Sequence, residues 1–259
     1  MSSVRSGVGR KVHGIGAAQI SERAWWDPTG FWFGLHTLLD PVRGPYFAAV
    51  LSGFSGPHVL DVGSGAGFVA AGIGGRARVV AIDRSEMALR DALAVGISPV
   101  AVADATELPF GDEIFDAVIC SEVLEHVSDP TRVIAEAARV TRPGGLFLFS
   151  TPARTPLSRL LLIQAAQRWP MTRLLPRDLH EWDRFLTPFE LGELLDANGF
   201  TPRELSGIGV PTRELPQALG ALLLLKLRHN GYAEAGRRVT LRTTKSTQIA
   251  MIGYAERTG

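Results

Sequence analysis

The stretch VLDVGSGAGF, from Val59 to Phe68, joins an apolar run to a helical pattern through a glycine-rich turn. Its glycines, Gly63, Gly65 and Gly67, stand where the apolar run ends and the helical pattern begins. Glycine at such a position permits a tight turn and lets a ligand approach the backbone closely. The stretch therefore predicts a strand, loop and helix unit whose loop binds a nucleoside.

An acidic residue follows at the distance that nucleoside binding needs. Asp83 ends the next apolar run, 20 residues after Gly63, where its carboxylate can accept hydrogen bonds from ribose hydroxyls. The dinucleotide fingerprint also requires a glycine at position 68, but the residue there is Phe68. This departure disfavours an NAD-dependent oxidoreductase and favours another ligand that contains a nucleoside.

Short apolar, β-branched runs alternate with helical patterns from Gly56 onward. Such alternation predicts a parallel sheet with helices on both faces. Strands are expected at residues 58–62, 77–83, 99–104, 115–121, 146–152 and 247–257, and helices at 67–75, 129–145 and 187–200.

Composition limits the partners and the compartment. The 259 residues carry a net charge of +1, which gives no general attraction to nucleic acid. Cys120 is the single cysteine, so no internal disulfide is expected; it suits a reducing cytosol and we interpret it as a buried strand residue. No apolar run reaches the ~18 residues of a membrane span, and the start of the chain lacks the apolar core of a signal peptide. We therefore expect a cytoplasmic protein.

Several motifs resemble those of the class I S-adenosylmethionine-dependent methyltransferases. LDVGSGAG (60–67) matches their loop, ADATELPF (103–110) their adenine-contacting stretch, and RPGGLFLFSTP (142–152) their fifth strand. The resemblance implies a Rossmann-like α/β fold with a mostly parallel seven-stranded sheet, helices on both faces, and S-adenosyl-L-methionine as cosubstrate. It assigns cofactor contacts to Gly63, Ser64, Gly65, Gly67, Asp83 and Asp104.

A narrower resemblance extends from Glu22 to Gly207. WWDPTGFWFGLHTLLDPVRGPYF (25–47), SEVLEHVSDP (121–130) and HEWDRFLTPFEL (180–191) are similar to segments of the ubiquinone-biosynthesis O-methyltransferases, which methylate a phenolic oxygen on a polyprenylated ring. It implies a lipophilic, phenolic or quinol-like acceptor. It also assigns cofactor contacts to Arg43 and Ser121, although Arg43 could instead be a solvated surface residue.

Asp61 has two interpretations that stay open. It matches the family position that orients the loop or the amino group of the ligand. Alternatively, it is a strand-end residue that hydrogen-bonds the turn.

Glu122, Glu125 and His126 are the candidate catalytic residues, and the resemblance implies that they are magnesium ligands. Their spacing is suitable, because residues i, i+3 and i+4 share one face of a helical turn. A divalent ion there would bind the acceptor oxygens and lower the pKa of the reacting hydroxyl. Two alternatives remain: His126 acts as a general base without metal, or Glu125 and His126 form a structural turn.

The segment 151–177 combines leucines with five arginines and contains no Asp or Glu. This composition is typical of a helix that lies on an anionic membrane surface. It would also suit a lid that packs its leucines over the active site. We expect a lid that also contacts lipid, as a lipophilic acceptor requires.

We expect a mobile tail at residues 1–18 and one methyltransferase domain at 19–259. Within that domain we expect an N-terminal cover of short helices at 22–52, the cofactor-binding core at 56–152, a basic apolar lid at 153–186, and a C-terminal substrate-side part at 187–259. Two rival functions are a C- or N-methyltransferase of another natural product and a catalytically silent S-adenosylmethionine-binding protein. The intact glycine loop and acids disfavour the silent protein.

Overall fold

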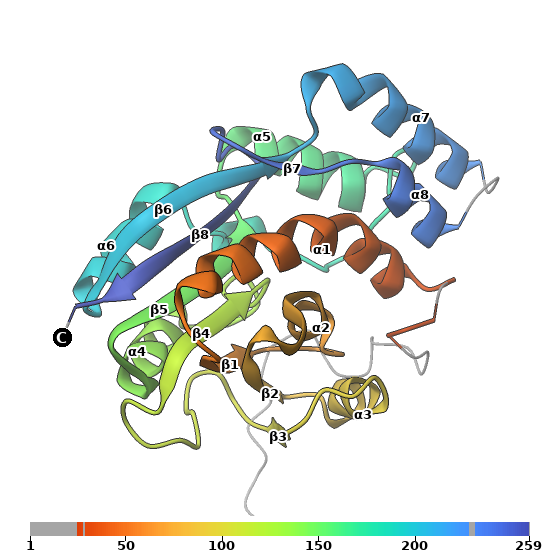
Figure 1. Ribbon diagram of the computed structural model, residues 1–259. Coiled ribbons are helices and arrows are strands. Elements are labelled where there is room, and N and C mark those ends of the chain that lie inside the picture. The colour runs from red at the N-terminus through yellow and green to blue at the C-terminus, as the bar shows by residue number, and fades with distance from the viewer. Residues whose placement is uncertain (1–24, 28, 228–230, 259) are drawn as a thin grey trace, which may run out of the picture.

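The computed structural model describes residues 25–27, 29–227 and 231–258, so the predicted tail at 1–18 lies outside the described part (Figure 1). Within that part, one sheet of eight strands has the order β3-β2-β1-β4-β5-β8-β6-β7. Neighbouring strands from β3 to β5 are parallel, whereas β8 is antiparallel to β5 and β6, and β7 is antiparallel to β6. The strands are β1 (His58–Val62), β2 (Arg78–Asp83), β3 (Val100–Val102), β4 (Phe115–Ser121), β5 (Thr141–Pro152), β6 (Phe200–Gly209), β7 (Arg242–Thr244) and β8 (Ala250–Arg257).

The sheet has the predicted α/β topology, and the strands predicted at 58–62 and 115–121 occupy those same residues. The number of strands exceeds the predicted seven because β7 adds a short edge strand beside Gly207–Gly209 of β6. The sequence of β7, Arg-Thr-Thr, has no apolar alternation. Backbone pairing alone defines such a strand, so periodicity could not indicate it.

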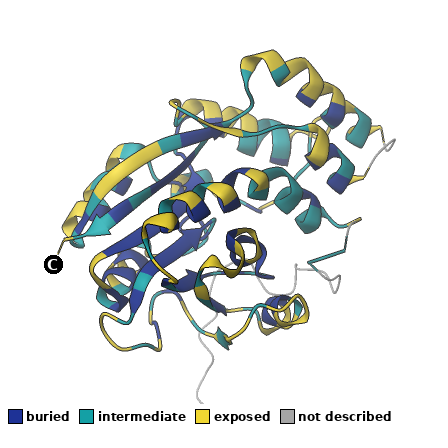
Figure 2. Cartoon of the chain, in the orientation of Figure 1, coloured by how far each residue is buried: buried dark blue, intermediate teal, exposed yellow. Residues whose placement is uncertain are grey.

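Helices cover both faces of the sheet, as the alternation predicts (Figure 1). The longer helices are α1 (Phe31–Val50), α2 (Phe68–Ile73), α3 (Glu86–Ala94), α4 (Pro130–Val140), α6 (Pro188–Ala197), α7 (Leu215–Lys226) and α8 (Tyr232–Arg238). Successive residues of β4 face opposite layers: Ala117 and Ile119 pack on the side of α1 and α2, and Val118 and Cys120 pack on the side of α4 and α6. The central strands are accordingly buried on both faces (Figure 2).

The N-terminal cover contains one long helix, α1, which corrects the expectation of several short helices. Pro41 and Pro45 lie inside it. A proline within a helix removes a backbone hydrogen bond and crowds the carbonyl four residues earlier. This cost is offset because the second half of α1 packs on the sheet, where Phe47 is fully buried with Val59 and Ile73. Tertiary packing therefore overrides the local sequence preference.

Side-chain caps begin α4 and α6, and the cap of α6 lies at the start of the helix predicted at 187–200. Thr187 and Glu190 form a capping box at α6: Glu190 N donates to Thr187 Oγ1 at 3.1 Å, and Thr187 N donates to the Glu190 carboxylate at 2.8 Å. Asp129 caps α4 by accepting a hydrogen bond from Arg132 N at 3.0 Å. These bonds satisfy backbone donors that the first helical turn leaves free.

The basic apolar segment folds as a short turn of helix, α5 (Pro156–Ser158), followed by a π-helix, η3 (Arg159–Arg168). An irregular stretch then leads to a 3₁₀ turn, η4 (Trp182–Arg184). In the described ranges, no helix is both long enough and apolar enough to cross a bilayer.

Candidate active site

The glycine loop joins β1 to α2 and needs glycine for two separate reasons. Gly63 has a φ of 67°, and a Cβ there would lie 2.4 Å from Val123 Cγ2. Gly67 has a φ of 78° at the start of α2, and a Cβ there would lie 2.7 Å from Ile97 Cγ1. Larger residues would therefore be strained in backbone conformation and would also clash.

Asp83, at the end of β2, orders this loop. One of its carboxylate oxygens accepts a hydrogen bond from Gly65 N at 2.8 Å, and the other accepts one from Ser85 N at 2.8 Å. Asp104 lies at the next turn, where its Oδ1 accepts hydrogen bonds from the backbone and hydroxyl of Thr106. Both acids thus stand at the carboxyl ends of parallel strands, where ligands bind in open α/β sheets. Their contacts with ribose and adenine remain predictions.

Asp61 and Ser64 each have one polar side-chain atom without a partner among the described residues. These atoms, Asp61 Oδ2 and Ser64 Oγ, are buried. Burial, and then the neighbouring Asp83 carboxylate, raise the pKa of Asp61 to about 7. Buried acceptors are rarely left unpaired, so these atoms fit a ligand that brings its own donors to the loop.

Aromatic side chains of the N-terminal cover lie over the loop. A Cβ at Gly65 would be 3.6 Å from Trp25 Cζ3, and Trp26 Nε1 donates to the Ala66 carbonyl at 3.1 Å. Phe68 stacks on Trp26, with a centroid separation of 4.0 Å, and on His36 at 3.7 Å. The phenylalanine that departs from the dinucleotide pattern therefore anchors the cover.

Arg43 of α1 belongs to a buried polar network and is not a surface residue. Its side chain is 2% exposed and forms an ion pair with Asp40 at 2.5 Å. Arg43 Nη1 donates to Ser121 Oγ at 3.3 Å. The Ser121 and Ser150 hydroxyls are 2.8 Å apart, and Ser150 donates to Glu122 Oε1 at 2.8 Å. Hydrogen bonds thus connect the predicted cofactor contacts to Glu122.

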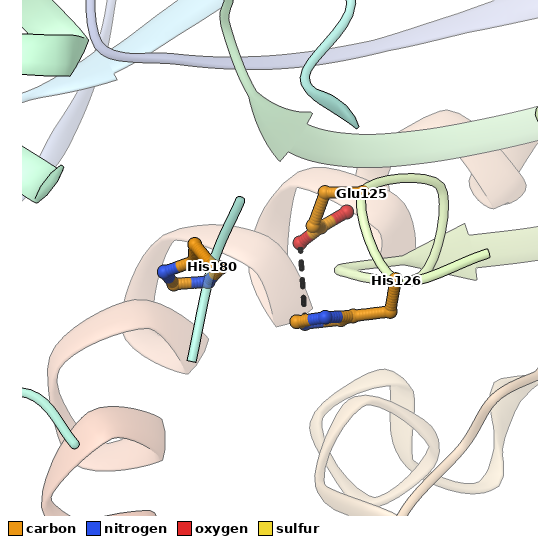
Figure 3. Close-up of side chains that lie close together, drawn as sticks. All are labelled: Glu125, His126 and His180. Carbon is orange, nitrogen blue, oxygen red and sulfur yellow. Dashed lines mark ion pairs between the residues drawn. The ribbon is translucent and has the colours of Figure 1, made fainter. Parts of the chain in front are cut away.

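Glu125, His126 and His180 form a second cluster (Figure 3). Each offers one ligand atom, and the three atoms lie within 4.8 Å of one another. Glu125 Oε1 is 3.9 Å from His126 Nε2, and the two imidazole rings stack with centroids 5.4 Å apart. Thr151 donates to Glu125 Oε2 at 3.0 Å, whereas the buried Oε1 has no hydrogen-bond partner in the described part of the chain.

Burial sets the protonation of this cluster. It lowers the pKa of His126, and together with His126 it lowers the pKa of His180 to about 3. Burial and the Glu122 carboxylate raise the pKa of Glu125 well above its ordinary value. Both imidazoles are therefore neutral at physiological pH, the form that accepts a proton or binds a metal.

Comparisons with known proteins show the family of the chain. The methyltransferase domain family matches residues 60–149. The ubiquinone biosynthesis O-methyltransferase of Alkalilimnicola ehrlichii is 38% identical over 208 residues, which cover 77% of this chain and 83% of that protein. Its counterpart in Nitrosomonas europaea is 37% identical over 194 residues, covering 71% of this chain and 80% of that protein. The chain belongs to the family of ubiquinone biosynthesis O-methyltransferases.

Membership makes the protein an S-adenosylmethionine-dependent methyltransferase, as the glycine loop and Asp83 predict. Solved structures confirm the Rossmann-like fold. A methyltransferase of Thermotoga maritima, described as a possible histamine N-methyltransferase, has a TM-score of 0.59 at 17% identity, over 87% of this chain and 93% of its own. At that identity the likeness concerns the fold alone.

The structure divides the predicted catalytic residues between two groups. Glu125 and His126 belong to the cluster with His180, whereas the Glu122 carboxylate lies 3.9 Å from Arg43 and accepts from Ser150. His180 was not singled out by the sequence. The family resemblance includes the stretch HEWDRF, which begins with this histidine. That stretch could have indicated His180 as a site residue.

The magnesium ion that the family resemblance implies fits this donor set poorly. Magnesium takes mainly oxygen ligands and keeps several waters. The cluster offers one carboxylate and two imidazoles, and Glu122 is not among its members. Magnesium at Glu122, Glu125 and His126 therefore stays a prediction.

Proposed function

We propose that this enzyme transfers the methyl group of S-adenosyl-L-methionine to a phenolic or quinol-like oxygen of a lipophilic small molecule. The name of its relatives supports O-methylation. The observation that carries the proposal is the cluster of buried Glu125 with the half-buried His126 and His180. Val123, two residues before Glu125, closely approaches Gly63 of the glycine loop, which supports a position for these groups beside the bound cofactor.

The cofactor side of the site would position the methyl donor. In this proposal Asp83 holds the ribose, and Asp61, Ser64 and the Arg43 network receive the polar groups of the methionine part. Trp25 and Trp26 cover the loop and limit the access of water. Fixed orientation of the two reactants is the main source of acceleration in such a transfer.

The acceptor side would prepare the oxygen. Methyl transfer needs an oxygen that is anionic and in line with the sulfonium methyl group. Neutral His126 is the group able to accept the phenolic proton. A divalent cation held by this cluster would supply positive charge that lowers the pKa of the acceptor hydroxyl.

We also propose an anionic membrane surface as a partner. Arg159, Arg168 and Arg177 of the lid are exposed, and the described stretch 154–177 contains no acid. Lys226 joins α7 to the lid by donating to the carbonyls of Pro170 and Arg173 at 3.0 and 3.3 Å. Exposed apolar residues lie on both elements: Leu157, Leu160, Leu161, Trp169 and Met171 on the lid, and Leu215, Leu219, Leu223 and Leu227 on or beside α7 (Figure 2).

Incubation with labelled S-adenosyl-L-methionine and a panel of catechols, quinols and polyprenyl phenols tests the proposal. Label should appear in an ether product of a phenolic acceptor, with higher kcat/KM for acceptors that carry an apolar chain. Transfer only to carbon or nitrogen acceptors would replace this function by the rival methyltransferase. Cofactor binding without transfer to any acceptor class would favour a silent binding protein.

A further inference from the structure

We propose that Trp25 of the N-terminal cover shields the nucleoside half of bound S-adenosyl-L-methionine, and that Asp91 of α3 positions Trp25 for this task. The indole ring would exclude water from one side of the nucleoside, and its Nε1 would donate a hydrogen bond to a ribose oxygen or an adenine nitrogen. The inference rests on the cofactor side of the proposed function and does not depend on the acceptor.

The Trp25 indole lies on the glycine loop, next to the predicted position of the ribose. A Cβ at Gly65 would be 3.6, 3.8 and 4.0 Å from Cζ3, Cη2 and Cε3 of Trp25, so the benzene edge of the indole faces this glycine. The amide of the same glycine donates to the Asp83 carboxylate at 2.8 Å. The indole and the ribose acid therefore meet at one residue of the loop, and a nucleoside held by Asp83 would lie beside the ring.

The indole nitrogen of Trp25 is a donor that lacks an acceptor. Trp25 Nε1 is buried and has no hydrogen-bond partner among the residues that the structure describes. An indole N–H can only donate, and a buried one usually has a partner. Asp61 Oδ2, in the strand before the loop, and Ser64 Oγ, within the loop, are unpaired in the same part of the chain. Unpaired atoms of the cover and of the loop fit one polar ligand that supplies the missing partners.

Contacts with two helices fix the position of Trp25. Its backbone N–H donates to Asp91 Oδ2 at 2.8 Å, which ties residue 25 to α3. Its ring stacks on Trp32 of α1, with centroids 4.8 Å apart and planes at 28°. A side chain that is already supported loses little freedom when a ligand binds, so these contacts preorganise the ring.

The place of α3 in the fold favours the nucleoside half over the methionine half. α3 packs on β2 and β3, and Ser85 N at its start donates to Asp83 at the end of β2. The Arg43 network, which we assign to the methionine part, instead reaches Ser121 at the end of β4. In the sheet, β2 and β4 lie on opposite sides of β1. Trp25, tied to α3, is therefore on the side of the ribose acid.

Calorimetric titration of the full-length protein with S-adenosylhomocysteine and with methylthioadenosine, which lacks the amino-acid part, tests the shield. Trp25→Ala should weaken the binding of both ligands by the same factor, roughly 10–100-fold, as expected for the loss of an aromatic contact with a base. Trp25→Phe keeps a ring but removes the donor, and should weaken both by roughly 2–10-fold. Phe189→Ala removes an exposed aromatic side chain from α6 and should bind both ligands like wild type.

The positioning role of Asp91 has matched variants on the same helix. Asp91→Ala should raise the dissociation rate of S-adenosylhomocysteine by roughly 3–10-fold, because the ring loses its backbone anchor. Asp91→Asn keeps an oxygen that accepts from the Trp25 amide, so its dissociation rate should equal that of wild type. Glu86→Ala, which removes the surface partner of Arg90, is the control. Stopped-flow displacement measures all four rates.

Wild-type affinity of Trp25→Ala for both ligands would overturn the shield. A loss confined to S-adenosylhomocysteine would also contradict it, because the ring would then contact the methionine part. Equal dissociation rates of Asp91→Asn and Asp91→Ala would remove the positioning role. Circular dichroism checks the folding of each variant, and if Trp25→Ala does not fold, Trp25→Phe and the Asp91 variants decide. Methylation of phenolic acceptors by the wild-type protein is measured separately, so failure of the shield leaves the proposed function standing.

Discussion

The core at residues 56–152 and the lid at 153–186 both contribute to the site, but they position their functional groups differently. In the core, strand ends and left-handed glycines such as Gly63 and Gly67 place Asp61 and Asp83 through backbone geometry. In the lid, His180 stands on an irregular segment and is held by the Gln167 side chain. Cofactor binding should therefore tolerate changes in the lid, whereas the acceptor side should depend on a few side-chain contacts.

The largest expected effect is a loss of turnover without a loss of cofactor affinity, which would show that the two regions have different functions. If the cluster of Glu125, His126 and His180 holds a cation, its removal with chelator should lower turnover by about 10²–10⁴-fold, because the acceptor oxygen would lose its charge stabilisation. Affinity for S-adenosyl-L-methionine should stay nearly constant, since its contacts lie in the core. Steady-state kinetics and calorimetry on the same sample measure both. Unimpaired turnover in chelator, together with an inactive His126→Ala, would instead establish a metal-free base.

A second prediction concerns the pH dependence of the core. Asp61 has a folded pKa of about 7, above its ordinary value, so the folded state binds the extra proton and loses stability as pH rises from about 4 through 7. Asp61→Asn removes that loss. Because one pKa unit corresponds to about 1.36 kcal/mol, the stability gain of the ligand-free variant over wild type should be larger at pH 8 than at pH 5 by about 2–3 kcal/mol. Urea unfolding at both pH values measures it; a pH-independent difference would contradict the buried, protonated carboxyl.

Cofactor affinity gives the third test. Asp83→Ala should weaken the binding of S-adenosyl-L-methionine and its demethylated product by about 1.5–3 kcal/mol, as expected for a charged hydrogen-bond acceptor. Part of this loss would come from the Gly65 amide, which Asp83 also holds. Glu86→Ala, a surface acid on α3, is the control. If calorimetry shows unchanged affinity in Asp83→Ala, the ribose does not bind at the end of β2.

The smallest effect is expected at the membrane surface. Arg168→Gln should weaken binding to anionic vesicles by about 1 kcal/mol, the contribution of one basic residue near charged lipid. Leu219→Ser on α7 should weaken binding to anionic and neutral vesicles alike, because it removes apolar area. Sedimentation at low and high salt distinguishes the two terms. Equally weak binding of wild type to both lipids would leave the lid without a membrane role.

The same contrast explains what the sequence could predict. The core strands, the glycine loop and the α6 cap were predictable because each depends on residues close together in the chain. His180 was missed because it joins Glu125 and His126 only through tertiary structure. The long helix α1 was missed for a related reason: Pro41 and Pro45 argue locally against it, and the packing of Phe47 that offsets them is not local. Glu122 and Glu125 are close in sequence but have different partners, which helical spacing alone does not show.

The tryptophans are distributed so that each region carries its own optical reporter. Trp25, Trp26 and Trp32 lie in the cover, with the Trp25 ring against Gly65, whereas Trp169 and Trp182 belong to the lid side, and these five are all the tryptophans of the chain. Indole emission responds to the polarity around the ring. Replacing Trp169 and Trp182 by phenylalanine would therefore leave fluorescence that reports the filling of the glycine loop alone. The intrinsic fluorescence of the protein could then be used to measure cofactor exchange in real time, without a label and without turnover.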